Sequence, residues 1–384
     1  MMSLMLPGML AFLVVLFGMP SLILVAKRKH LLDEPTEARK LHHRAVPTVG
    51  GVMVFAGLMV SVLVGSAVEG LALESRWIGA LGAMFLVFLM GVKDDIVGMG
   101  PYRKLLIHLG VGLFLVMALD WRIKGFGGLF GLDALPLIVS WAFSLFVYVV
   151  IVNAVNLIDG IDGLAGGFGM ILMGGVAHWF YLTGDATASL IAMATLGALG
   201  GFLVFNYNPA KIFLGDSGAL ILGLLAYVFA VAMMDSNVAP DVAVSPPVAA
   251  MSLLAYPLVD TLRVFTLRVL QGRSPFSPDR QHIHHAMIDL GWNHRQVSGA
   301  VWGYTYLFTA LAFQPIDVME GQVTVHFALL LGTAFGISMV PKLMLRLRKS
   351  GSENALENSQ VLHPRTSIRP RTSAHAKPKG QHVA

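Results

Sequence analysis

The stretch AFSLFVYVVIVNAVNLIDGIDG, residues 142–163, decides the fold of this chain. Its apolar first part is typical of a helix that enters a lipid bilayer, and it ends in a run of amides, carboxylates and glycines. A carboxylate at the centre of a membrane helix costs on the order of 2.5–3.5 kcal/mol on insertion scales. A chain that keeps several of them at the ends of apolar runs is therefore expected to use them in chemistry with a cation.

The polar residues of this stretch follow helical spacing. Asn153, Asn156 and Asp159 are three positions apart, so a helix would place their side chains on one face. The glycines that follow Asp159 and Asp162 allow tight turns and a close approach of the backbone to a ligand. The plainer alternative is a capped helix end, but one Asn and one Gly would satisfy a cap. The number of polar residues favours a ligand site.

Composition indicates a membrane protein with an all-α fold. Of its 384 residues, 56% are hydrophobic and only 13% are charged, against about 25% charged residues in soluble domains. The chain has no cysteine, which excludes disulfides, thiolate nucleophiles and cysteine-ligated zinc. A bilayer core needs about 20 apolar residues per helix, and on this basis we predict about eleven transmembrane spans. They are 4–26, 46–68, 77–92, 104–119, 135–154, 165–183, 187–206, 217–235, 246–266, 297–314 and 323–345.

The distribution of lysine and arginine predicts the orientation. If the spans alternate, one side of the membrane receives nearly all the basic loop residues, and the other side receives only Arg76, Arg122 and Lys124. Basic loops mark the cytoplasmic side, so the N-terminus is expected outside and the C-terminus inside. This asymmetry, rather than a nucleic-acid partner, accounts for the formal charge of +5. Residues 1–349 form the predicted membrane domain, and the polar, basic residues 350–384 are predicted to be a disordered cytoplasmic tail.

Two further acidic motifs fall on the same predicted side. Asp94 and Asp95 follow the third span, and Gly215-Asp216-Ser217-Gly218 precedes the eighth. Each motif alone has a plain alternative, a solvated helix end for the first pair and an N-cap for Asp216. Their placement with Asp159 on one face of the membrane nevertheless favours a shared polar pocket.

Basic and imidazole side chains also lie on this predicted face. The loop after the ninth span contains Arg280, His282, His284 and His285, which suit either a zinc ion or hydrogen bonds to phosphate oxygens. A polar loop that is merely rich in histidine is the alternative. The segment 39–51 begins Arg-Lys-Leu-His-His-Arg and ends in Gly-Gly, and attraction to anionic lipid is its plain interpretation.

These motifs, in this order, resemble those of the polyprenyl-phosphate N-acetylhexosamine-1-phosphate transferases over roughly residues 10–345. Within that family the chain is most similar to bacterial members that transfer N-acetylglucosamine 1-phosphate to undecaprenyl phosphate. The resemblance implies an enzyme of the bacterial inner membrane, with about eleven spans and an active site on the cytoplasmic face. The signature of the members that use UDP-N-acetylmuramoyl-pentapeptide fits less well. The motifs that support the resemblance are Arg39-Lys40-Leu41-His42 with Pro47 and Gly50-Gly51, Asp94-Asp95, Asn153 to Gly163, Phe213 to Gly218, and Pro275 to His285.

The resemblance also implies the roles of individual residues. The expected metal site holds Mg2+, or Mn2+, on Asp216 with Asn156 nearby. The expected catalytic residues are Asp94, Asp95, Asp159 and His282. The expected substrate-binding residues are Lys104, Asn153, Asp162, Asn206, Phe213, Arg280, His284 and His285.

The implied reaction joins two anions, a UDP-N-acetylhexosamine and undecaprenyl phosphate, and releases UMP. The product would prime a cell-envelope polysaccharide such as an O-antigen. The acidic pair is expected either to accept a proton from the lipid phosphate or to form an aspartyl-phosphate, and both routes stay open. A homodimer, a UDP-N-acetylmuramoyl-pentapeptide substrate and, in another class, a secondary transporter also stay open. A transporter would be expected to carry ionisable groups near the membrane midplane and an inverted repeat.

Overall fold

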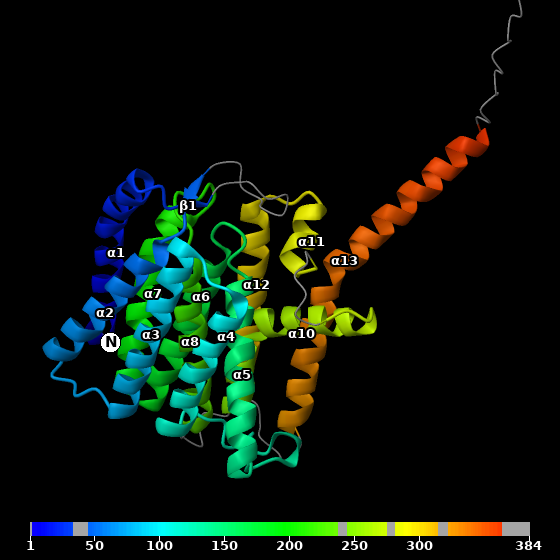
Figure 1. Ribbon diagram of the computed structural model, residues 1–384. Helices are drawn as coiled ribbons and strands as arrows, with labels where there is room; N and C mark the ends of the chain where they lie inside the picture. Colours follow the sequence, from blue (N-terminus) through cyan, green and yellow to red (C-terminus); the bar gives the residue numbers. More distant parts are fainter. Residues whose placement is uncertain (1, 34–44, 237–243, 275–280, 314–321, 363–384) are drawn as a thin grey trace, which may run out of the picture.

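The computed structural model describes residues 2–33, 45–236, 244–274, 281–313 and 322–362, which form a bundle of helices with one short strand pair, β1 with β2 (Figure 1). The elements are α1 Met2–Arg28, β1 Leu32–Asp33, β2 Val46–Pro47, α2 Gly50–Val68, α3 Ser75–Val97, α4 Pro101–Leu113, η1 Phe114–Ala118, η2 Leu129–Gly131, α5 Leu137–Leu157, α6 Leu164–Thr183, α7 Ala186–Asn206, α8 Gly215–Asp235, α9 Pro246–Leu253, α10 Ala255–Leu270, α11 Ile283–Asp289, α12 His294–Ala312 and α13 Gln322–Leu362. Helices are the expected solution because a bilayer offers no water to satisfy backbone N–H and C=O groups.

The predicted class of all-α membrane protein is confirmed. Nine helices of the described residues are long and apolar enough to cross a membrane, and the bent pair α9 and α10 is a tenth candidate. Helix α12, which covers most of the predicted span 297–314, is outside that set. The count of eleven and the orientation therefore stay predictions.

Helix α8 lies at the centre of the bundle, between α3 and α5. Of the 18 consecutive residues that make up the most apolar part of each helix, 89% are buried in α8, compared with 22% in α1 and 17% in α13. Glycine permits this close packing, because a Cβ atom on Gly91 of α3 would lie 2.5 Å from the Cα atom of Ser217. The first residues of α8 are therefore held against the last turns of α3, where the acidic pair lies.

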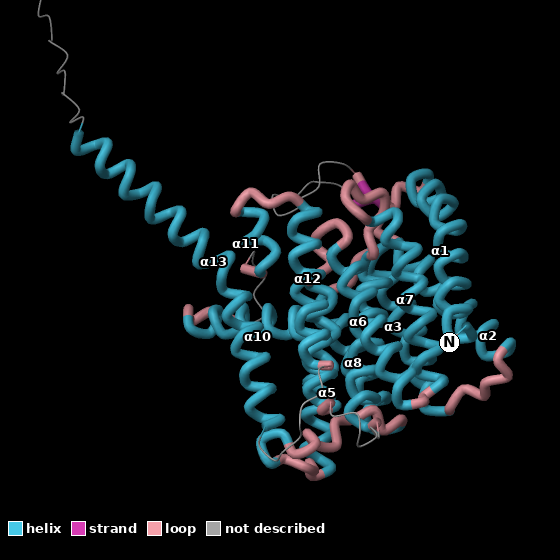
Figure 2. The backbone as a smooth tube through the Cα atoms, turned by 180° about the vertical axis from the view of Figure 1, so that it is seen from behind, coloured by secondary structure: helices cyan, strands magenta, loops and turns pink. Residues whose placement is uncertain are grey.

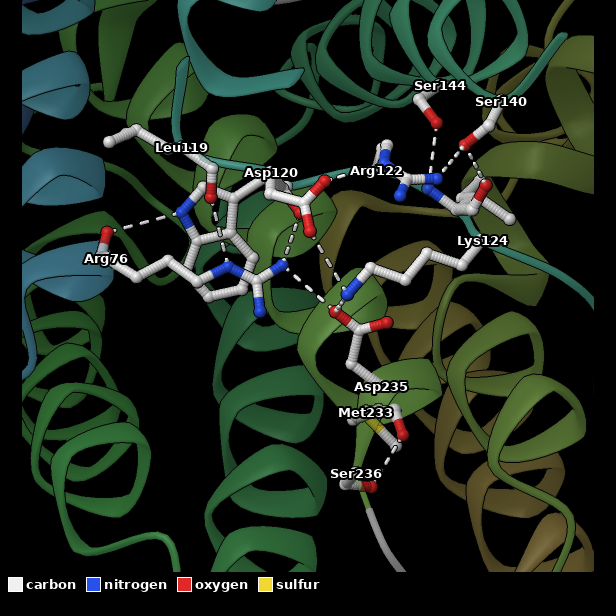
Figure 3. Close-up of polar contacts among 12 residues, drawn as sticks. Arg76, Leu119, Asp120, Arg122, Lys124, Ser140, Ser144, Met233, Asp235 and Ser236 are labelled. Atoms are coloured by element: carbon white, nitrogen blue, oxygen red, sulfur yellow. Dashed lines mark hydrogen bonds and ion pairs between the residues drawn. The ribbon is translucent and has the colours of Figure 1, made fainter. Parts of the chain in front are cut away.

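The two helices are also fastened at their other ends by an ion-pair network (Figure 3). Arg76, near the start of α3, and Lys124 each lie 3.0 Å from the carboxylate of Asp235 at the end of α8. The guanidinium of Arg76 also stacks over the ring of Trp121, 3.7 Å from its centroid. The Arg76, Arg122 and Lys124 side chains, the three basic residues predicted for the outer side, thus gather in one place with Asp120 and Asp235. We call this network the distal clamp.

The predicted span 246–266 consists of two helices, α9 and α10, bent by 72°. Pro257 explains the break, because its nitrogen has no hydrogen to donate and its ring crowds the carbonyl of residue 253. Both views show α10 running across the direction of the neighbouring helices (Figures 1 and 2). The bend brings the side chains of α10 under the segment that contains the predicted histidines.

Helix α13 continues past residue 350 to Leu362 and projects from the bundle (Figure 1), and the division into a membrane domain, 1–349, and a tail, 350–384, stays a prediction. Extending an existing helix avoids the cost of nucleation, and residues 353–357, Glu-Asn-Ala-Leu-Glu, include good helix formers. Residues 363–384 lie outside the described residues.

Candidate active site

The acidic motifs meet at the end of the bundle opposite the distal clamp. The carboxylate of Asp95, in the last turns of α3, accepts hydrogen bonds from the backbone N–H groups of Asp216 (2.7 Å) and Ser217 (3.0 Å). These N–H groups belong to the first turn of α8 and have no partner within that helix. Asp95 therefore supplies from another helix what an N-cap residue would supply from the same chain segment.

Glycine is required at position 215, where α8 begins. Gly215 has φ +71°, a left-handed conformation, and a Cβ atom there would lie 1.9 Å from the carbonyl oxygen of Thr48. The segments around it are joined by backbone hydrogen bonds from Gly50 to Phe213 (3.0 Å) and from Phe213 to Pro47 (2.7 Å). The predicted Pro47 to Gly51 and Phe213 to Gly218 motifs thus form one structural unit.

Lys104 brings a positive charge to the cluster from the first turn of α4. Its Nζ atom lies 2.9 Å from an oxygen of Asp94 and 2.5 Å from an oxygen of Asp216. All three side chains are partly buried, so this ammonium group is the direct counter-ion of both carboxylates. The predicted substrate-binding lysine is thus in contact with two of the predicted acidic residues.

Asp159 joins the cluster from the loop between α5 and α6. It accepts a hydrogen bond from the backbone of Gly215. Burial, with the nearby charges of Asp216 and Asp95, raises the pKa of Asp159 well above its usual range. The predicted convergence of Asp94, Asp95, Asp159 and Asp216 is therefore confirmed, and the site has more carboxyl groups than cations among the described residues.

The two predicted asparagines of α5 differ. The side chain of Asn156 is partly buried and has no hydrogen-bond partner among the described residues, so its amide is free for a ligand. Asn153 is exposed, and its amide donates to the carbonyl of Val149 in the same helix (2.7 Å). No contact among the described residues joins Asn153 to the aspartates, so its predicted role in substrate binding stays a prediction.

Asp162 and Asn206 hold two loops together. Asp162 accepts hydrogen bonds from the side chain of Asn208 (2.8 Å) and the backbone of Ala210 (3.0 Å), and Asn206 accepts one from the backbone of Gly163 (2.9 Å). Burial alone would raise the pKa of Asp162, but its hydrogen bonds with His294 and with these groups hold it below the ordinary value. Both side chains are buried and satisfied, so their contacts are those of structural residues.

Residues 281–285, which we call the histidine segment, lie beside the loop between α5 and α6. A Cβ atom on Gly160 would lie 3.8 Å from Nε2 of His284. Burial and, next, the charge of His285 lower the pKa of His284 to about 3, so this imidazole is neutral at physiological pH. The rings of His282 and His284 are parallel within 6°, and that of His285 lies 4.4 Å from that of His284. Arg280 and residues 39–44 of the basic segment lie outside the described residues.

Two residues that the sequence interpretation did not single out support these histidines. Asp260 of α10 lies 2.9 Å from Nδ1 of His282, and Arg263 lies 2.6 Å from Asp260. Their signal was present in the sequence, because an aspartate and an arginine three positions apart lie within the apolar run 246–266.

The donor chemistry of the site fits a magnesium ion. Mg2+ takes oxygen ligands, and here carboxylates of Asp94 and Asp216 share a single ammonium group while the amide of Asn156 has no partner in the described part of the chain. In the part of the chain that the structure describes, no three histidine or carboxylate side chains are grouped closely enough to hold an ion as they stand. An ion would therefore bind with substrate oxygens as additional ligands, as is usual for Mg2+ beside phosphates.

Comparisons with known proteins agree with this site. A model of glycosyl transferase family 4 matches residues 77–234. The decaprenyl-phosphate N-acetylglucosaminephosphotransferase of Mycobacterium tuberculosis (strain ATCC 25618 / H37Rv) is 31% identical over 348 residues, covering 83% of this chain and 86% of that protein. The probable undecaprenyl-phosphate N-acetylglucosaminyl 1-phosphate transferase of Bacillus subtilis (strain 168) is 29% identical, with coverages of 79% and 82%. The undecaprenyl-phosphate alpha-N-acetylglucosaminyl 1-phosphate transferase of Escherichia coli (strain K12) is 29% identical, with coverages of 71% and 73%.

Proposed function

The chain belongs to glycosyl transferase family 4, and on this premise we propose that it transfers N-acetylglucosamine 1-phosphate from UDP-N-acetylglucosamine to a polyprenyl phosphate. The products are UMP and a lipid pyrophosphate-linked sugar. The observation that supports this most directly is the convergence of four aspartates from three separate segments with Lys104 at one end of the bundle. Undecaprenyl phosphate is the acceptor that we propose, since relatives from Bacillus subtilis and Escherichia coli carry it in their names.

The chain's own charges address the main physical obstacle, which is the repulsion between two phosphate-bearing substrates. Lys104 would contact the diphosphate, and His284, which stays neutral, would donate a hydrogen bond to it rather than add charge. A dianionic lipid phosphate needs little help from a base near neutral pH, because its second pKa is about 6. Positioning the two substrates would then supply most of the acceleration.

We assign the metal site to Asp216 and Asn156, with Asp94 adjacent. A bound Mg2+ or Mn2+ would neutralise the diphosphate and stabilise the UMP leaving group. The contacts favour Asp94 over Asp95 for direct chemistry on the lipid phosphate. Both oxygens of Asp95 already accept hydrogen bonds from the start of α8, whereas one oxygen of Asp94 meets the ammonium group of Lys104.

We place the site at the cytoplasmic face of the bacterial inner membrane, with eleven spans and the N-terminus outside. Basic loop residues support this orientation, because most of them share the end of the bundle where the aspartates lie. At this face the enzyme would meet a soluble nucleotide sugar and a lipid headgroup together. The product would prime a cell-envelope polysaccharide.

The direct test is incubation of the purified protein with labelled UDP-N-acetylglucosamine, undecaprenyl phosphate and Mg2+. We expect lipid-linked product and UMP in equal amounts, and loss of both when EDTA is added. Competition with UDP-N-acetylgalactosamine and UDP-N-acetylmuramoyl-pentapeptide tests the choice of sugar. Preference for either competitor would overturn the choice of N-acetylglucosamine.

Matched substitutions at the two ends of α8 test the assignment of the site. Asp216→Asn should abolish transfer, whereas Asp235→Asn, the same change at the distal end, should leave the turnover of the folded protein intact. Transfer that survives Asp216→Asn would count against the proposed metal site.

A further inference from the structure

One face of α10 supports the histidine segment. Tyr256, Asp260 and Arg263 are spaced four and three positions apart, so they line one side of the helix. Asp260 meets Nδ1 of His282 at 2.9 Å, and the hydroxyl of Tyr256 meets Nδ1 of His284 at 3.4 Å. The same ring nitrogen of each histidine therefore faces α10. The Nε2 nitrogens are left for contacts on the other side, where Gly160 lies beside His284.

Both oxygens of the Asp260 carboxylate are in hydrogen-bond contact with neighbouring groups. Its side chain is 2% exposed, and it accepts hydrogen bonds from the guanidinium of Arg263 (2.6 Å) and the backbone N–H of Ile283 (3.1 Å) besides its contact with His282. A carboxylate held by an arginine and a backbone N–H stays ionised, so it can only accept a hydrogen bond from Nδ1–H. The N–H of His282 is thereby fixed at Nδ1.

Arg263 contacts the histidine segment as well as Asp260 of its own helix. The guanidinium is fully buried and donates both to Asp260 and to the carbonyl of Gln281, directly before His282 (2.6 Å). The ion pair thus connects α10 to the backbone of the histidine segment at two points. Such a partner of an imidazole sets both its ring orientation and its protonated nitrogen.

We propose that Asp260, held by Arg263, is a positioning residue that fixes the Nδ1–H tautomer of His282 and directs its Nε2 to the sugar nucleotide, where this nitrogen can accept a hydrogen bond from a hydroxyl or amide N–H. Tyr256 holds the ring of His284 in the opposite sense, because its hydroxyl can donate to Nδ1 and leave the proton of His284 on Nε2, where it can donate to the diphosphate. This inference rests on the proposed function for the identity of the ligand. The tautomer and the orientation are properties of the protein and are tested independently of it.

A double-mutant cycle tests whether Asp260 acts through His282. We expect Asp260→Asn and His282→Gln each to lower kcat/KM for the sugar nucleotide by about 10- to 100-fold, the usual effect of losing the outer partner of a functional histidine. The double variant should be no slower than His282→Gln alone, because the two residues act as a unit. Losses that multiply, or full activity of Asp260→Asn, would overturn the proposal.

A charge-matched background keeps this cycle informative if Asp260→Asn fails to fold. Removing Asp260 alone leaves Arg263 buried without its partner, which is a strongly destabilising change. Asp260→Asn with Arg263→Gln removes both charges and restores the balance. The cycle with His282→Gln is then repeated in this background, with the same expected absence of a further loss.

Nitrogen-15 NMR of histidine-labelled protein gives a readout that does not depend on activity. The signals of His282 are identified by their disappearance in His282→Gln. We expect an Nδ1–H tautomer in the wild type and its loss in the Asp260 variant. An Nε2–H tautomer in the wild type would overturn the inference. If the wild-type protein transferred no sugar phosphate but showed the Nδ1–H tautomer, only the proposed function would fail.

Tyr256 and Tyr304 provide a matched pair of controls. Their rings are 5.9 Å apart, but the hydroxyl of Tyr304 donates to the carbonyl of Ala334 rather than to a histidine. Tyr256→Phe should raise KM for the sugar nucleotide, and Tyr304→Phe should leave it unchanged. An equal effect of both changes would indicate that the hydroxyl of Tyr256 only supports packing.

Discussion

Two adjacent aspartates of α3 have different environments, which separates their roles. Asp95 binds the first backbone N–H groups of α8 with both carboxylate oxygens, whereas Asp94 contacts the side chain of Lys104. The first arrangement stabilises a helix end, and the second leaves a carboxylate beside the proposed substrates. The repeated letters of the sequence do not reveal this difference.

Amide substitutions should separate the two roles. Asp95→Asn leaves only one oxygen to accept two N–H donors, so both the thermal stability and the transfer rate should fall. The loss of a cap costs about 1 kcal/mol. Asp94→Asn should abolish most transfer with little change in the melting temperature. Thermal unfolding in detergent and the transfer assay measure the two effects, and equal destabilisation by both changes would contradict the assignment.

Asp159 should make stability depend on pH. Its pKa is raised in the folded protein, mainly by burial, so folding favours the protonated carboxyl and stability decreases as pH rises from the unfolded pKa through the folded pKa. Asp159→Asn removes this penalty. We expect its melting temperature to exceed that of the wild type at neutral pH, with a difference that shrinks under acidic conditions. A pH-independent difference would contradict this account.

At the scale of the element, α3 and α8 depend on close backbone contact. Gly91 of α3 faces the start of α8, where a Cβ atom would come within 2.5 Å of Ser217, whereas a Cβ atom on Gly82 of the same helix would meet nothing within 4 Å. The two positions therefore separate the effect of helix packing from the effect of glycine itself.

Gly91→Ala should force α3 away from α8 and displace Asp95 from the N–H groups that it binds. We expect a lower melting temperature and a large loss of transfer. Gly82→Ala should leave transfer unchanged and, since alanine is favoured over glycine in a helix by up to about 1 kcal/mol, should not lower the melting temperature. Similar behaviour of the two variants would show that the close contact is unimportant.

At the scale of the whole molecule, the distal clamp and the acidic cluster lie at opposite ends of the same two helices. Arg76 and Asp235 join α3 to α8 at one end, and Asp95 and Asp216 join them at the other. Arg76→Gln should lower the melting temperature, because its ring contact with Trp121 and its ion pair are lost together. The turnover of the protein that remains folded should be unchanged. A changed KM for the sugar nucleotide would mean that the clamp reaches the active site.

The absence of native cysteine makes the orientation directly measurable. Tyr102, at the end of the bundle with the acidic cluster, and Leu132, near the distal clamp, are both exposed. In intact cells a membrane-impermeant maleimide should label Leu132→Cys and should leave Tyr102→Cys unlabelled until the cells are opened. The reverse pattern would place the site outside and remove access to UDP-sugars.

The sequence allowed the helical class, the approximate helix positions and the convergence of Asp94, Asp95, Asp159 and Asp216 to be predicted. Apolar run length and helix-end position contain that information. Spacing along one helix did not reveal that Asn153 is exposed and donates to Val149 while Asn156 is partly buried, because lateral packing decides which part of a face is covered. The pairing of Asp260 with His282 depends on the bend between α9 and α10, which no periodicity reports.

Crosswise α10 has a second consequence. Leu262 and Val269, on the side of α10 away from Asp260, are 56% and 59% exposed, so a membrane would place them in contact with acyl chains. The opposite side of α10 contacts the imidazoles of His282 and His284. Bilayer thickness and fluidity would then bear on the catalytic groups mechanically, without any effector, and the rate measured in one host lipid need not transfer to another.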